Sequence, residues 1–121
     1  MRVLIVQGDR NLAWVWQRHL ERQGCEVEVV STQEDAVAAI RNGPLNVIVL
    51  DVVLEGGSAF AVSDYASYRQ PATKVIFVTN TTFFSDGSIF QHAPNACAFL
   101  RTGTPPEDLA AMVEHYGATV L

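Results

Sequence analysis

The sequence predicts an α/β protein, built as a doubly wound parallel sheet of five strands with helices on both faces. Short apolar runs rich in β-branched residues recur at 2–6, 47–50, 74–79 and 96–100. Such runs are typical of strands that are buried on both sides. Segments with apolar residues at helical spacing separate the runs. Several runs lead into a carboxylate or a threonine, at the place where open α/β sheets bind their ligands.

The composition fits one domain that spans residues 1–121, with 49% apolar and 17% charged residues. A net charge of −5 and a single lysine, Lys74, argue against a nucleic-acid surface. The apolar stretches are far shorter than the ~20 residues of a membrane helix, and the N-terminus lacks a signal-peptide pattern. Cys25 and Cys97 show neither metal-ligand spacing nor a disulfide framework, so we expect buried thiols in a reducing cytoplasm and no membrane partner.

The first strand is expected at 2–6 and the first helix at 11–23, with Gly24 as the residue that ends the helix. Residues 26–30 alternate acidic with apolar, as a half-buried edge strand does. Residues 31–34, Ser-Thr-Gln-Glu, offer a cap and early acidic residues for a second helix that runs to about 41, before Asn-Gly-Pro.

The remaining elements follow from the same signals. Residues 81–93 should be helical by position, but their threonines, serines and glycine favour a short or irregular helix. We expect a strand at 47–50 followed by Asp51, a helix at 60–69 that stops before Pro71, a strand at 74–79, the irregular segment at 81–93, a strand at 96–100, and a helix at 106–116 with Gly117 after it.

Five strands that alternate with helices fit the flavodoxin-like order 2-1-3-4-5. The order reverses between the first and third strands, and a crevice opens at their carboxyl ends. Asp51 should therefore face the loop Gln7-Gly8-Asp9 across this crevice, with Thr79 beside it.

These residues resemble the response-regulator receiver domain of two-component signal transduction over essentially the whole chain. The landmarks are VIVLD with Asp51, the VT of VIFVT with Thr79, AFL with Phe99, and a first helix that ends at Gly24. The resemblance implies that Asp51 stands where the family accepts a phosphoryl group from a histidine kinase in a phosphorelay. It also implies that Thr79 and Phe99 stand at the switch positions.

The resemblance further implies a Mg²⁺ site made by two consecutive acids after the first strand, and a lysine after the fifth strand. Here the acid pair falls on Gln7 and Gly8, and the lysine falls on Thr102. Glycine has no side-chain ligand, and glutamine offers only a neutral oxygen. The missing charges would remove several kcal/mol of stabilisation from phosphoryl transfer, so the phosphorylation site looks degenerate.

Three residues are candidates to compensate. Asp9 could enter the metal site, but it lies one residue further along, where it is expected to cap the first helix. Arg101 could replace the lysine, but successive side chains of a strand point to opposite faces, so Arg101 should point away from the face of Thr102. The third candidate is Glu55, which stands where the family usually has a proline in the loop after the phosphoacceptor. The candidate metal ligands are Asp9, Asp51 and Val53. We expect no resident cofactor, with Mg²⁺ bound weakly if at all.

Two functions remain open. The first is a pseudo-receiver without enzymatic activity or catalytic residues, which acts as a protein–protein interaction module. The second is a genuine phosphoacceptor, phosphorylated on Asp51 by a histidine kinase despite impaired Mg²⁺ binding. A hydrolase is excluded: Gly56, Ser58 and Phe60 approach a nucleophile elbow, but the last glycine and a placed histidine base are missing.

The expected partner is a protein: a histidine kinase, an output domain or another receiver, with a homodimer as a further candidate. Two surfaces carry apolar side chains beyond those of one amphipathic stripe. One is made by Phe83, Phe84, Ile89 and Phe90, and the other by Trp14, which falls on the polar side of the first helix. We expect one of these surfaces to support dimerisation or docking.

Overall fold

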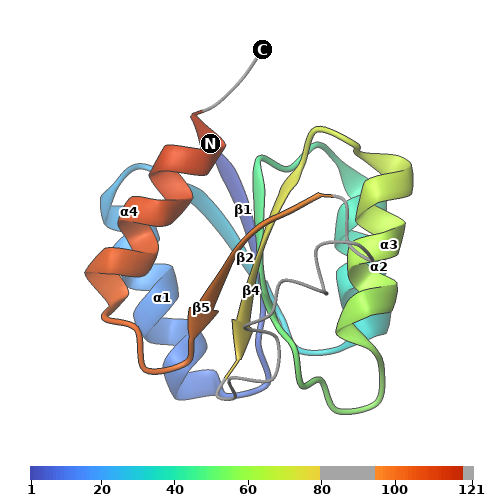
Figure 1. The fold of residues 1–121 in the computed structure, drawn as a ribbon, viewed down its shortest axis with the longest axis horizontal. Helices are drawn as coiled ribbons and strands as arrows, with labels where there is room; N and C mark the ends of the chain where they lie inside the picture. Colours follow the sequence, from blue (N-terminus) through green and yellow to red (C-terminus); the bar gives the residue numbers. More distant parts are fainter. Residues whose placement is uncertain (80–94, 119–121) are drawn as a thin grey trace.

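In the computed structural model, which describes residues 1–79 and 95–118, a parallel sheet lies between two layers of helices (Figure 1). The strand order β2-β1-β3-β4-β5 is the order predicted from the sequence. The strands are β1 (Arg2–Val6), β2 (Glu26–Val30), β3 (Val47–Asp51), β4 (Lys74–Thr79) and β5 (Ala96–Arg101). The helices of the described residues are α1 (Arg10–Arg22), α2 (Gln33–Asn42), α3 (Ala59–Arg69) and α4 (Pro106–Gly117).

The helices α1 and α4 cover one face of the sheet, and α2 and α3 cover the other (Figure 1). Strand residues alternate between the two cores: Val3 and Ile5 of β1 face α1 and α4, whereas Leu4 and Val6 face α2 and α3. The central strands are therefore buried on both sides, which explains why they read as unbroken apolar runs. The edge strand β2 is only half-buried, and its exposure alternates as predicted from Glu26 to Glu28, but Val29 is exposed as well, contrary to the predicted alternation.

The predicted elements agree with the structure to within one or two residues, with a correction at Gly117. This glycine was expected after the last helix, but it is the last residue of α4 and is buried. A Cβ there would overlap the Met1 sulfur and approach Val47 Cγ2 to 3.2 Å. Gly117 therefore lies inside the end of the helix, in close contact with the side chains of Met1 and Val47. The predicted irregular helix at 81–93, with the four apolar residues of its surface, lies outside the described residues.

Cys25 is buried, but Cys97 is only half-buried, contrary to expectation, and both thiols are free. Burial raises the pKa of the Cys97 thiol to about 11, and it also raises the pKa of Cys25. Both thiols therefore stay protonated near neutral pH. No helix in the described part of the chain is long and apolar enough to cross a bilayer.

The loop between β3 and α3 is fastened to α2 by one hydrogen bond, from the Ser58 amide to Gln33 Oε1 at 2.8 Å. Gly57 lies so close to Gln33 that an added Cβ would overlap the Gln33 Cβ. We expect Gly57→Ala to displace the Gln33 side chain and break its hydrogen bond with the Ser58 amide. The free energy of unfolding, measured by urea denaturation, should fall by about 1–3 kcal/mol. Gly103→Ala is the matched control, because a Cβ at Gly103 meets nothing within 4 Å. Equal stability of the two variants would contradict the packing role of Gly57.

Candidate functional site

A cavity of about 340 Å³ lies at the carboxyl edge of the sheet, where the strand order reverses between β1 and β3. The register pairs Val6 with Leu50, which brings the next residues, Gln7 and Asp51, to neighbouring positions at this edge. The cavity is lined by Gln7, Gly8, Asp9, Leu12, Asp51, Val53, Glu55 and Thr102. The topology thus assembles the crevice that the sequence predicted.

Asp51 is the last residue of β3 and is partly exposed to the cavity. Its Oδ1 accepts a hydrogen bond of 2.9 Å from the Val53 amide, which orients the carboxyl group. Asp51 makes no ion pair with any described residue. The second carboxyl oxygen makes no hydrogen bond with a described residue either, so an acceptor oxygen is available to the cavity.

Gln7 is almost fully buried, with 4% of its surface exposed. Its Oε1 accepts a hydrogen bond of 3.0 Å from the Asp9 amide, which closes the loop after β1. Its buried Nε2 has no hydrogen-bond partner among the described residues. Gln7 therefore supplies a neutral donor at a position where a metal site needs a charged oxygen. Gly8, beside it, leaves open space where a Cβ would stand.

Asp9 caps α1, as predicted from its position. Its Oδ1 accepts hydrogen bonds from the amides of Asn11 at 3.0 Å and Leu12 at 3.2 Å. Moving the carboxylate to a metal would break the cap, at a cost of about 1 kcal/mol. Asp9 lines the cavity, but its carboxylate already accepts the hydrogen bonds that cap α1.

Thr102 lines the cavity at the position of the family's lysine, and its amide donates to Thr79 O at 2.9 Å. Arg101 is exposed and does not line the cavity, in agreement with the prediction that it points to the other face of the strand from Thr102. Thr79 is buried at the end of β4. Phe99 is half-buried and stacks on Phe77, with ring centroids 5.2 Å apart and ring planes at 10°. Aromatic stacking thus connects β5 with the core beneath α3.

Among the described residues, the charge of the cavity lining is entirely negative. Asp9, Asp51 and Glu55 contribute carboxylates, and none of the described lining residues is a lysine, arginine or histidine. No group of three His, Cys, Asp or Glu residues in the described ranges is arranged to hold a metal ion. An anionic phosphoryl group approaching Asp51 would therefore meet uncompensated negative charge. Sequence reasoning missed Leu12, which lines the cavity because it lies one helical turn after Asp9.

Comparisons with known proteins agree with this geometry. The response regulator receiver domain model matches residues 3–113. The chain is 30% identical, over 79 residues, to the transcriptional regulatory protein TcrA of Mycobacterium tuberculosis (strain ATCC 25618 / H37Rv). That match covers 65% of this chain but only 31% of TcrA, so the chain spans about a third of the length of this relative.

Solved receiver structures share the fold. A CheY-like receiver domain from Methanospirillum hungatei JF-1 has 26% identity and a TM-score of 0.87, over 96% of this chain and 92% of that one. The non-phosphorylated HemR receiver domain from Leptospira biflexa has 19% identity and a TM-score of 0.87, over 99% and 96% of the two chains. The family match, the strand order and the switch-point cavity together show that the chain belongs to the response regulator receiver domain family.

Proposed function

We propose that this receiver domain acts mainly as a non-enzymatic protein–protein interaction module with a degenerate phosphorylation site. The observation that carries the proposal is the pair Gln7 and Gly8 at the cavity, where one residue is a neutral amide and the other has no side chain. These two positions fit Mg²⁺ poorly, because Mg²⁺ in proteins is held largely by carboxylates and water, and neither Gln7 nor Gly8 has a carboxylate. Asp51 and Glu55 are the carboxylates of the lining that make no helix cap.

The proposed partners are a histidine kinase, an output domain or another receiver, and no cofactor is required. Two free cysteines support a reducing compartment such as the cytoplasm. The alternative is a genuine phosphoacceptor with impaired Mg²⁺ binding. It is favoured by the oriented carboxyl group of Asp51, which keeps an oxygen available to the cavity.

Phosphorylation of Asp51 separates the two functions. Incubation with acetyl phosphate and Mg²⁺, followed by Phos-tag electrophoresis, should give no retarded band, because no cation among the described lining residues offsets the charge of the incoming group. Asp51→Asn is the control, and it should migrate like the parent. A retarded band that disappears in Asp51→Asn would establish the phosphoacceptor instead. A Mg²⁺ titration should likewise leave the amide resonances around Asp51 unshifted at millimolar concentrations.

A further inference from the structure

A second hollow of about 350 Å³ lies beside the edge strand β2, between the first two turns of α1 and the start of α2. We call it the α1–β2 groove. Its walls include Arg10, Trp14 and Gln17 from α1, Val29 and Ser31 at the end of β2, and Asp35 from α2. Gln7 lines both this groove and the switch-point cavity, so the two hollows are neighbours.

The apolar part of the groove is exposed. Trp14 has 56% of its surface exposed and Val29 has 37%. The guanidinium carbon of Arg18 lies 4.8 Å from the centre of the Trp14 ring and covers one part of it. Tryptophan and arginine are enriched among the residues that dominate binding energy in protein interfaces. The position of Trp14 on the polar side of α1 was predicted from the sequence, and the structure confirms it.

The two walls of the groove carry opposite charges. Arg10 is exposed on the α1 wall and Asp35 is exposed on the α2 wall. Neither makes an ion pair with another described residue. A strongly acidic partner would be repelled by Asp35, and a strongly basic one by Arg10. The groove therefore fits a partner that presents a carboxylate to Arg10 and a basic group to Asp35.

A second copy of this chain has that arrangement. In a two-fold dimer the same patch serves both subunits, so residue i meets residue j and residue j meets residue i. The Arg10 wall of one copy would then face the Asp35 wall of the other at two equivalent places, around a centre made by Trp14 and Val29. Glu26 and Glu28 on the edge strand disfavour direct pairing of the two β2 strands, so side chains must carry the contact.

We propose that the α1–β2 groove is a self-association surface that takes a second copy of this chain in a two-fold arrangement. The proposal rests on the proposed function as an interaction module and names its partner. It requires no phosphoryl group and no metal, so association measured without either is independent of the outcome at Asp51.

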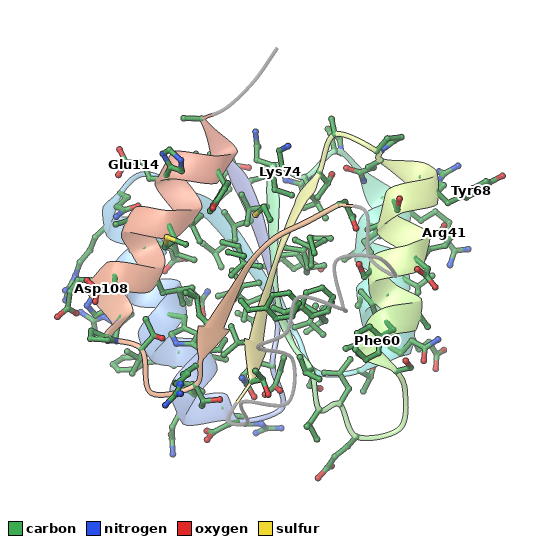
Figure 2. All side chains as sticks on the ribbon, in the orientation of Figure 1. Arg41, Phe60, Tyr68, Lys74, Asp108 and Glu114 are labelled. Carbon is green, nitrogen blue, oxygen red and sulfur yellow. The ribbon has the colours of Figure 1, made fainter. Side chains whose placement is uncertain are left out.

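Sedimentation equilibrium of the parent chain, without phosphate or Mg²⁺, should show a monomer–dimer equilibrium. Trp14→Ala should raise the dimer dissociation constant by about 30-fold or more, as expected for a central tryptophan. Tyr68→Ala is the matched control. Tyr68 is 80% exposed and points outward from α3, away from the sheet (Figure 2), and its removal should leave the dissociation constant unchanged.

A charge exchange tests the two-fold geometry. Arg10→Asp alone places two carboxylates at each contact, and Asp35→Arg alone places two guanidinium groups there, so each variant should be monomeric. An equimolar mixture should form a heterodimer, because both contacts then join opposite charges. Circular dichroism and thermal melting verify that each variant is folded.

Three results would overturn the proposal. They are a parent chain that stays monomeric at the highest concentration, a dimer indifferent to Trp14→Ala, and folded charge variants whose mixture remains monomeric.

Discussion

Restoring the missing charges should convert the switch-point cavity into a working phosphoacceptor site. The variant combines Gln7→Asp, Gly8→Asp and Thr102→Lys, all at residues that line the cavity with Asp51. The sheet sets the direction of side chains at strand ends, and a Cβ at Gly8 meets nothing within 4 Å, so the new groups have both orientation and room. We expect modification by acetyl phosphate in the presence of Mg²⁺, detected as a retarded band in Phos-tag electrophoresis, where the parent gives none.

The same variant should show opposite changes in stability without and with the metal. Without Mg²⁺ it should melt below the parent, because new carboxylates converge on Asp51 and one of them occupies the buried position of Gln7. Mg²⁺ at about 100 times its dissociation constant should then add about 2.7 kcal/mol, since it binds only the folded state. Adding Asp51→Asn should abolish the modification. A folded variant whose melting temperature does not respond to Mg²⁺ would show that Asp51 does not lie in a receiver pocket.

Removing the side-chain amide of Gln70, at the amino edge of the sheet, should cause a large loss of stability. Gln70 follows α3, and its side chain makes four hydrogen bonds across three segments. Its Nε2 donates to Ile40 O and to Gly43 O, both at 2.7 Å. Its Oε1 accepts from the Leu45 amide at 2.8 Å and from the Thr73 hydroxyl at 3.0 Å. The Thr73 hydroxyl contacts Leu45 O at 2.8 Å as well, so the end of α2 and the approaches to β3 and β4 share one network.

Gln70→Ala leaves these partly buried groups without their partner, and we expect the free energy of unfolding to fall by about 3 kcal/mol in urea denaturation. Gln70→Glu keeps the volume and the acceptors but removes both donors, so it should also destabilise. The control is Gln23→Ala at the exposed end of α1, which should change stability by no more than about 0.5 kcal/mol. A loss no larger for Gln70→Ala than for Gln23→Ala would mean that water replaces the network at no cost.

The network around Gln70 also marks a limit of sequence reasoning. The residues it joins are 25 to 30 positions away along the chain, apart from Thr73, and no local pattern singles out this glutamine. The same holds for Gly117, where the short-range reading as a helix terminator was wrong. Its close contacts are with Met1 and Val47, which only the folded chain brings near.

The strand positions, the helix boundaries to within one or two residues and the cap at Asp9 could be predicted from the sequence through local physics: the period of apolar residues, the chemistry of helix ends, and the alternation of side chains along a strand. The strand order, and with it the position of Asp51 at the switch point, came from the general arrangement of doubly wound α/β sheets. The family resemblance placed Thr102 at the cavity, and the alternation of side chains along the strand turned Arg101 away from it.

How the site is closed and what surrounds it could be learned only from the folded chain. Gln7 is buried with an amide nitrogen that has no partner among the described residues, and the described lining of the cavity carries carboxylates without a cation. The fold also brings Trp14, Val29, Arg10 and Asp35 to the lining of one groove. These are contacts between segments that are distant in the chain. Their geometry depends on how helices pack on the sheet, which the spacing of residues along one element does not specify.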